Sequence, residues 1–277
     1  MKNVLVPVEL HSSIDATFAT ALLFARRFGS YMEGMPLGPD LPDLVAFDMP
    51  VSWTVADQNT WRELAEESHR HFETVMTAAG VPTHEASPEG LSWGWAGETA
   101  FGDSHVSSYA RIFDITVLGR PGSDRSDARM ATAEAALFES GRPLLLAPPR
   151  APASVGDTAV IVWNQSLETT RATAFAMPVL KTAKRVVVLT ITEHKSEGPT
   201  GDQLAHNLRA NGVPAEALER SGKGRSHGEA ILEAAASVGA DLLVKGAYTQ
   251  SRLRQMIFGG ATSHILARAE LPVFISA

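Results

Sequence analysis

The chain has 277 residues, with 24 Lys and Arg against 31 Asp and Glu, and a formal net charge of −7. This balance disfavours a general nucleic-acid binder, which needs a basic surface to neutralise phosphates, so we expect no nucleic-acid partner. The chain has no cysteine, which excludes disulfides, thiolate catalysis and cysteine-based metal sites. At roughly 100–200 residues per domain, the length predicts two domains or one large one.

The N-terminal residues do not have the pattern of a signal peptide. Pro7 and Glu9 interrupt the first apolar run too early for an export signal. No stretch approaches the roughly 20 consecutive apolar residues of a membrane helix. We therefore expect a cytoplasmic protein with no membrane partner.

Two segments of the chain follow the same pattern. Residues 114–119 read as a buried strand that ends in glycine, and residues 241–246 read the same way. A polar loop, a helical stretch and a strand led by Pro143 or Pro272 follow each of them. The opening strands, 4–8 and 159–163, are each followed by an amphipathic helix. This repetition predicts one structural unit encoded twice.

Strands and helices alternate along each half. In the second half the patterns predict strands at 158–163, 185–191, 215–220, 241–246 and 272–276, and helices near 167–181, 201–211, 227–238 and 261–269. Uniformly apolar strands suit a parallel sheet that is buried on both faces. The predicted fold class is α/β, with two tandem doubly wound domains, each a five-stranded parallel sheet flanked by helices.

The predicted domains are residues 1–149 and 150–277, with the boundary in the proline-rich segment after residue 147. The first domain has an insertion, residues 35–58, that contains several prolines and no sustained period. We interpret this insertion as a long loop.

In a doubly wound sheet, ligands bind beyond the carboxyl ends of the strands, where the strand order reverses. In the second half this rule points to Val162 and Asn164 after the first strand and to Gly246 after the fourth. Gly259 and Gly260 open the last helix. A glycine-rich helix start can bind phosphate through its backbone amides.

Residues 246–262 resemble the nucleotide loop of the universal stress protein family. The family pattern is Gly, two residues, Gly, nine residues, Gly, then Ser or Thr. Gly246 and Gly259 match it in identity and spacing, whereas Thr249 replaces the second glycine. Gly260 stands at the Ser or Thr position, and Thr262 supplies a hydroxyl. The whole chain resembles a tandem two-domain member, whose fold is adenine nucleotide alpha hydrolase-like.

The resemblance implies ATP as a ligand of the second domain, and no motif decides whether Mg²⁺ accompanies it. Asn164 stands where the family has an acidic residue that contacts the ribose, and the strand end near Ile191 would face the adenine. The implied nucleotide-binding residues are Val162, Asn164, Ile191, Gly246, Thr249, Gly259, Gly260, Ala261 and Thr262.

The first half has a weaker match. Pro7 and Glu9 stand at the strand-one site, and Gly119 and Gly122 match the first two glycines of the loop. No later glycine follows at the required spacing, so we expect no nucleotide there in the family manner.

Several polar residues near these strand ends have two interpretations. A basic rim for phosphates, or an ordinary solvated loop surface, could be formed by Arg252, Arg254, Lys245, Lys223 and Arg225. His11 and Ser13 lie in the turn after the first strand, where we expect them to cap the following helix.

The sequence thus predicts a regulatory protein of the universal stress type that binds ATP or another adenine nucleotide in its second domain. The resemblance also implies an intramolecular pseudo-dimer of the two halves and a homodimer of whole chains. One alternative is a dimeric interaction module without nucleotide, which the threonine at 249 favours because it fits poorly where glycine is required. Another is a slow ATPase. No catalytic or metal-ligating constellation is recognisable by motif, so we predict no such residues.

Overall fold

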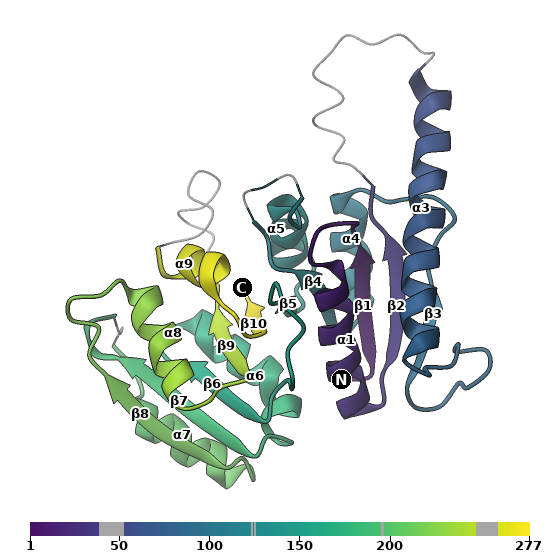
Figure 1. The fold of residues 1–277 in the computed structure, drawn as a ribbon. Helices are drawn as coiled ribbons and strands as arrows, with labels where there is room; N and C mark the ends of the chain where they lie inside the picture. Colours follow the sequence, from purple (N-terminus) through teal and green to yellow (C-terminus); the bar gives the residue numbers. More distant parts are fainter. Residues whose placement is uncertain (39–52, 123, 125, 195–196, 248–259) are drawn as a thin grey trace. The chain divides into compact units, whose positions relative to one another are not determined.

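The computed structural model describes residues 1–38, 53–122, 124, 126–194, 197–247 and 260–277. Its contacts divide the chain into two compact units, which Figure 1 shows as ribbons. The first unit contains residues 1–119 and 123–142, and the second contains residues 120–122 and 143–277. The boundary at residues 149 and 150 follows the sequence repeat and stays a prediction.

The sheet of the first unit has the strand order β3-β2-β1-β4, and every pair in it is parallel. Its strands are β1 (Asn3–Val8), β2 (Tyr31–Pro36), β3 (Ser92–Trp95) and β4 (Ile115–Gly119). Val4, Leu5 and Val6 are completely buried, because helices cover both faces of the central strand.

The helices of the first unit are α1 (Ile14–Phe28), α3 (Trp53–Ala78), α4 (Asp103–Tyr109) and α5 (Met130–Glu139), with a short 3-10 turn η1 (Ala110–Ile112). In Figure 1, α1 and α3 lie on one face of the sheet, and α4 and α5 lie on the other. Helix α3 takes in residues 53–58, so the predicted loop ends earlier than the sequence suggested. Most of that insertion, residues 39–52, lies outside the described residues.

The second unit has the strand order β5-β10-β9-β6-β7-β8. Its strands are β5 (Leu144–Ala147), β6 (Thr158–Val162), β7 (Arg185–Ile191), β8 (Ala215–Arg220), β9 (Leu242–Gly246) and β10 (Val273–Ser276). The five strands from β6 to β10 pair in parallel, as predicted. Strand β5, expected to close the first sheet, is grouped here because it pairs antiparallel with β10, with Leu145 opposite Phe274.

The helices of the second unit are α6 (Leu167–Leu180), α7 (Gly201–Ala210), α8 (His227–Ser237) and α9 (Gly260–Arg268), with a 3-10 turn η2 (Thr192–His194). Local signals in the sequence start three of them. The hydroxyls of Ser166, Thr200 and Ser226 each accept a hydrogen bond from an amide in the first turn of their helix. In α7, Gln203 completes a capping box with Thr200.

An aspartate before the fourth strand of each repeat holds the start of the first strand. The Asp241 carboxylate accepts hydrogen bonds from the amides of Gly156 (3.1 Å), Asp157 (3.0 Å) and Thr158 (2.8 Å) and from the Ser154 hydroxyl (2.5 Å). Thr158 begins β6, so one side chain fixes the chain just before two central strands.

Its counterpart in the first unit, Asp114, does the same with fewer bonds. One oxygen of its carboxylate accepts from the amides of Lys2 (2.5 Å) and Asn3 (3.1 Å). The aspartate that begins each repeated segment of the sequence therefore has a structural function in both units.

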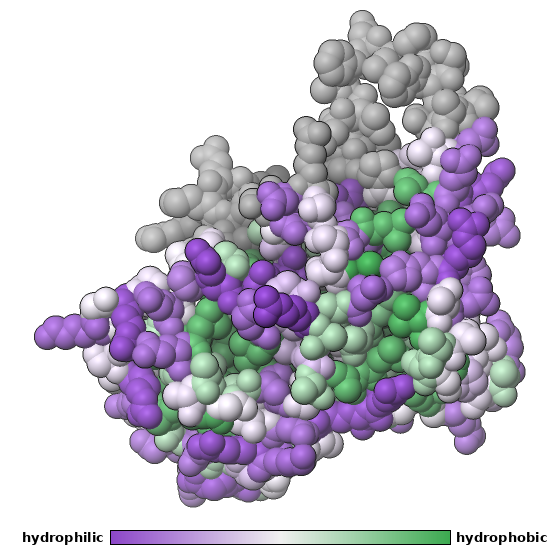
Figure 2. Space-filling view, viewed as in Figure 1, coloured by the Kyte–Doolittle hydropathy of each residue, from purple (hydrophilic) through white to green (hydrophobic). Residues whose placement is uncertain are grey.

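On the visible faces, hydrophilic residues surround smaller hydrophobic areas (Figure 2). The large apolar side chains exposed among the described residues are Leu10, Ile112 and Leu167. Nowhere in the described part of the chain is a helix both long enough and apolar enough to span a membrane.

Replacement of Asp241 by Ala should lower the free energy of unfolding by about 2–3 kcal/mol, because amides at the start of β6 lose a charged acceptor. The matched change Asp114→Ala should cost only about 1 kcal/mol, since it removes two bonds at an exposed site. Urea denaturation of both variants measures the difference. Equal losses, or a smaller loss for Asp241→Ala, would contradict this account.

Candidate functional site

A cavity opens in the second unit at the carboxyl ends of β6 and β9. It encloses about 200 Å³, and its wall consists of Val162, Asn164, Ser166, Glu168, Thr169, His227, Lys245, Gly246, Ala247 and Ala261. Strand β6 has β7 on one side and β9 on the other, so the strand order reverses here. The cavity therefore lies where a doubly wound sheet binds ligands.

The structure brings together four of the residues that the sequence predicts for this site. Val162, Asn164, Gly246 and Ala261 line the cavity. The preceding Gly260 opens α9. These residues come from β6, β9 and α9, far apart in the sequence.

Of the other predicted residues, two do not line the cavity and two lie outside the residues that the structure describes. Thr262 lies in the first turn of α9 and accepts a hydrogen bond from Lys245. Ile191 is the last residue of β7, and only 3% of its surface is exposed. It does not line the cavity. Instead it lies close to Gly222, where an added Cβ atom would contact the Ile191 side chain. Thr249 and Gly259 lie outside the described residues.

Sequence reasoning missed four residues of the wall. Ser166, Glu168 and Thr169 form the start of α6, and His227 is the first residue of α8. The order of strands and helices could have indicated these residues. The helices that follow the first and third strands both begin at the edge of the sheet where the carboxyl ends of the strands lie, so their first residues can reach the site.

Asn164 shapes the turn between β6 and α6. Its side-chain oxygen accepts hydrogen bonds from the Ser166 amide (3.2 Å) and the Thr169 hydroxyl (2.5 Å). Between them, Gln165 adopts a positive φ of 66°, which is uncommon for a residue other than glycine. Because the oxygen is engaged in the turn, a ligand would meet the amide nitrogen of Asn164, a hydrogen-bond donor.

Gly246 lets helix α6 approach strand β9 closely. A Cβ atom at this position would lie 2.5 Å from the backbone carbon of Glu168 and 2.5 Å from the amide nitrogen of Thr169. Those atoms belong to the helix backbone and cannot rotate away. The glycine therefore has a packing function as well as a place in the cavity wall.

Lys245 is buried, with 7% of its surface exposed, although it was interpreted from the sequence as part of a loop surface or rim. Its ammonium group donates to the Gly246 carbonyl (2.7 Å) and the Thr262 hydroxyl (2.8 Å). Burial lowers the pKa of Lys245 to about 8. Two of the other proposed rim residues, Arg252 and Arg254, lie outside the described residues.

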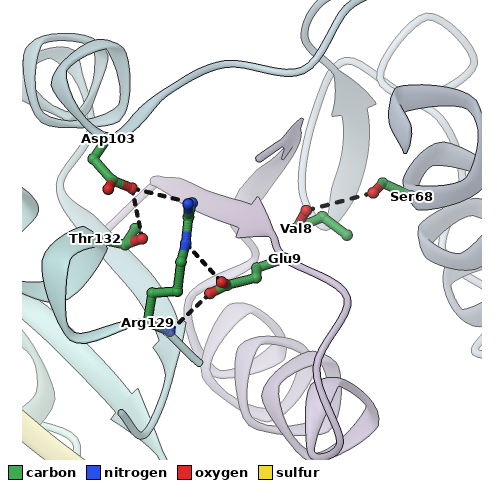
Figure 3. A network of polar contacts seen from close by, with 6 residues as sticks. All are labelled: Val8, Glu9, Ser68, Asp103, Arg129 and Thr132. Carbon is green, nitrogen blue, oxygen red and sulfur yellow. Dashed lines mark hydrogen bonds and ion pairs between the residues drawn. The ribbon is translucent and has the colours of Figure 1, made fainter. Parts of the chain in front are cut away.

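At the corresponding strand ends, the first unit has a network of ion pairs and hydrogen bonds (Figure 3). The Arg129 guanidinium lies between Glu9 (Nε to Oε1, 2.7 Å) and Asp103 (Nη2 to Oδ1, 3.2 Å). Thr132 donates its hydroxyl to the same Asp103 oxygen at 2.6 Å. Burial raises the pKa of Glu9 above its ordinary value, and the Arg129 amide and guanidinium oppose this shift.

These residues occupy the positions that form the cavity in the second unit. Glu9 follows β1 as Asn164 follows β6, and Asp103 opens α4 as His227 opens α8. An arginine between two carboxylates therefore lies at these strand ends in the first unit. That the first half holds no nucleotide in the family manner stays a prediction.

In the first unit, the His11 ring lies close to Gly119, the glycine that ends β4. A Cβ atom at Gly119 would lie 2.5 Å from the His11 ring. The predicted side-chain cap at Ser13 is wrong, because no side-chain cap bond forms there. Instead, the Ser13 amide donates to His11 Nδ1 (3.2 Å), and burial lowers the pKa of His11 to about 4.

The fold and the cavity define a doubly wound α/β protein with a ligand crevice at the strand ends of its second unit. Residues 157–276 match the model of the universal stress protein family. Over these residues, most of the second unit is similar to that family.

Solved structures extend the likeness in fold to the whole chain. The crystal structure of a universal stress protein from Archaeoglobus fulgidus DSM 4304 has a TM-score of 0.74 and 16% identity, and covers 99% of this chain and 95% of that one. The functionally unknown protein PA1789 from Pseudomonas aeruginosa PAO1 has a TM-score of 0.50 and 14% identity, with 100% and 92% coverage. At these identities the likeness concerns the fold alone.

A curated protein matches over a short segment. The stress response protein NhaX of Bacillus subtilis (strain 168) is 38% identical over 47 residues, which is 17% of this chain. The aligned segment spans 28% of the length of NhaX.

Gly246→Ala should lower the free energy of unfolding by about 2–3 kcal/mol, because the new methyl group overlaps the backbone of α6. The control is Gly260→Ala, which meets no atom within 4 Å and should change stability by less than about 0.5 kcal/mol. Thermal and urea unfolding compare the two variants. A tolerated alanine at position 246 would refute the proposed close packing.

Arg129→Met should destabilise the first unit by about 3 kcal/mol at pH 7, because two carboxylates lose their partner. Burial raises the pKa of Glu9 and Arg129 lowers it, so the pKa should rise further in the variant. The ionised carboxylate then costs the variant stability, which is regained as the pH falls through that pKa. The loss should therefore shrink between pH 7 and pH 5. Adding Glu9→Gln to the variant should recover part of it at pH 7. A loss that is independent of pH, with no recovery in the double variant, would argue against this charge network.

Proposed function

We propose that this protein is a cytoplasmic stress-response regulator whose second unit binds ATP or another adenine nucleotide. The observation that carries the proposal is the cavity at the ends of β6 and β9, where four predicted nucleotide-binding residues meet. The similarity of residues 157–276 to the family supports the stress-type role, and the resemblance of residues 246–262 supports the choice of ligand.

The chemistry of the wall suits a ligand with hydroxyls and phosphates. Helices α6, α8 and α9 all begin at the cavity, so the positive ends of their dipoles converge there. The amide nitrogen of Asn164 can donate to a ribose hydroxyl, as the family's acidic residue would accept from one. Lys245 adds a cation.

A bound ligand would connect parts of the second unit that lie far apart in the sequence. It would touch the turn after β6, the end of β9 and the starts of three helices. Binding should therefore stabilise this unit against unfolding. Regulation follows if the ligand binds one conformation, or one partner-bound state, better than another.

An interaction module without nucleotide is the second candidate, and the size of the cavity favours it. The described wall encloses about 200 Å³, below the roughly 300–1,000 Å³ of common small-molecule pockets. In this reading the glycines serve packing, as Gly246 does. The homodimer implied by the family resemblance stays a prediction under either function.

The test is mass spectrometry of nucleotide released on denaturation, followed by calorimetric titration with ATP. We expect binding with a dissociation constant below about 1 mM. Ala261→Leu should weaken it at least tenfold, because the larger side chain enters the cavity from α9. The matched control Ala131→Leu changes an exposed residue near the start of α5 and should leave binding intact. Phosphate release during the titration tests for the slow ATPase.

Two outcomes would count against nucleotide binding. One is the absence of both released nucleotide and heat of binding at millimolar ATP, which would support the interaction module. The other is equal affinity in Ala261→Leu, provided that this variant melts like the parent protein. In that case ATP binds elsewhere.

A further inference from the structure

A glutamate on β2 of the first unit is held between two tyrosines. The Tyr31 hydroxyl donates to Glu33 Oε2, and the Tyr109 hydroxyl donates to Glu33 Oε1, each at 2.5 Å. Tyr31 and Glu33 lie two residues apart on β2, so both point to the face of the sheet that α4 covers (Figure 1). Tyr31 begins β2 and Tyr109 ends α4, so this cluster lies towards the amino ends of the strands, away from the cavity end of a doubly wound sheet.

Glu33 has no lysine, arginine or histidine as a partner in the described part of the chain. Two cations of neighbouring segments are engaged elsewhere. The Lys2 ammonium donates to the Phe28 carbonyl (2.6 Å), and the Arg111 guanidinium donates to the Glu139 carbonyl (3.3 Å). All three residues of the cluster are partly exposed. Its carboxylate can therefore meet a cation from outside the chain.

The second unit has a complete ion pair at the equivalent place. Arg185 begins β7 as Tyr31 begins β2. The Arg185 guanidinium pairs with Glu216 on the neighbouring edge strand β8 (Nη2 to Oε1, 2.6 Å). In the first unit the corresponding residue of the edge strand β3 is Gly94, and the carboxylate comes from Glu33 on β2 instead. The first unit thus has the acid at this place but no guanidinium.

The fold does not require this cluster. Val187 stands in β7 where Glu33 stands in β2, and it is completely buried apart from 1% of its surface. Counted back from the aspartate that begins each repeated segment, Ala236 stands where Tyr109 stands. The second unit therefore forms the same sheet and helix with small apolar residues at both places. A charge that the fold does not require, at an accessible place, points to a function.

The remaining acceptor sites of Glu33 fit a guanidinium group. An ionised carboxylate has about four acceptor sites, two on each oxygen. The tyrosine hydroxyls take one on each oxygen, which leaves one on each oxygen for a further donor. A guanidinium presents two parallel N–H groups that match the two oxygens of a carboxylate, whereas an ammonium is a point charge.

Aromatic rings beside the carboxylate favour the same flat cation. The Tyr31 ring lies 4.8 Å from the His84 ring. The Tyr109 ring lies 5.8 Å from His105 and 5.3 Å from Phe113. A guanidinium plane stacks on aromatic faces, and the negative face of the ring attracts its charge.

The tyrosines stay protonated donors at neutral pH. Burial and the hydrogen bond to Glu33 raise the pKa of Tyr109 to about 12. The same causes raise the pKa of Tyr31, and the negative charge of Glu85 adds to that shift. Glu85 therefore lies near enough to add to the negative potential at the cluster.

We propose that Glu33, Tyr31 and Tyr109 form a binding site for a guanidinium group, carried by a small molecule or by an arginine side chain of another protein. The Glu33 carboxylate binds the two N–H groups, and the tyrosine rings flank the flat cation. The site belongs to the first unit and does not depend on nucleotide binding by the second. The alternative is that the two tyrosines and the glutamate only tie α4 to β2.

The experiment titrates the full chain with butylguanidinium and butylammonium, which carry the same charge on the same alkyl chain. We expect butylguanidinium to bind with a dissociation constant of about 1 mM or lower. Butylammonium should bind at least about fivefold more weakly, because it cannot form the bidentate pair. A capped glycine peptide with one central arginine distinguishes the two sources of the guanidinium. Tighter binding of this peptide than of butylguanidinium would identify a protein partner, and weaker binding a small molecule.

Glu33→Gln should weaken butylguanidinium binding at least about tenfold, since the neutral amide keeps the shape but loses the charge and one acceptor oxygen. The control Glu73→Gln removes the same charge from an exposed residue of α3 and should leave binding intact. Tyr109→Phe keeps the ring and the carboxylate and should weaken binding less than Glu33→Gln does. Butylguanidinium should raise the melting temperature of the parent protein but not that of Glu33→Gln.

Three outcomes would overturn the guanidinium site. One is no binding of butylguanidinium or of the arginine peptide at about 20 mM, far above the expected dissociation constant. Another is equal affinity in Glu33→Gln and the parent protein, and the third is equal affinity for butylammonium. ATP affinity should be the same in Glu33→Gln and the parent protein, so this site and the nucleotide site can fail independently.

Discussion

The second unit depends on the contact between the start of α6 and the end of β9. Gly246 has no side chain, so the backbone of Glu168 and Thr169 can rest directly on the strand. This contact brings the turn after β6, shaped by Asn164, against the end of the neighbouring strand. The cavity lies beside that contact, because Gly246, Glu168 and Thr169 all belong to its wall.

The two units place different side chains at corresponding strand ends. In the first unit, Glu9 and Asp103 create negative charge, and Arg129 neutralises part of it from inside the protein. In the second unit, Asn164 and His227 take those positions and Lys245 adds a cation. The carboxylates of the first unit thus meet a cation of the same chain, whereas the polar side chains of the second unit line a cavity.

Much of the fold could be predicted from the sequence, because each strand and helix has a local cause. Apolar runs such as Val186–Leu189 identify buried parallel strands, and Ser166 and Ser226 mark helix starts. The pairing of β5 with β10 could not be predicted from these patterns, since it joins two closing strands with equally apolar sequences.

The site was only partly predicted from the sequence. Glycines and strand ends were recognisable, but the burial of Lys245 depends on α9 packing over β9, which no local pattern encodes.

Strand β5 has a consequence for how the chain can be divided. It is encoded with the first repeat, yet it forms the outer partner of β10 in the second unit. A fragment that begins at residue 150 would lack it, so the side of β10 that pairs with β5 would have no partner, whereas the other side would still pair with β9. Such an unprotected edge recruits strands from other molecules and favours self-association. The oligomeric state of the isolated second repeat would therefore report an artefact of truncation, whereas a fragment that begins before Pro143 would keep the pairing of β5 with β10.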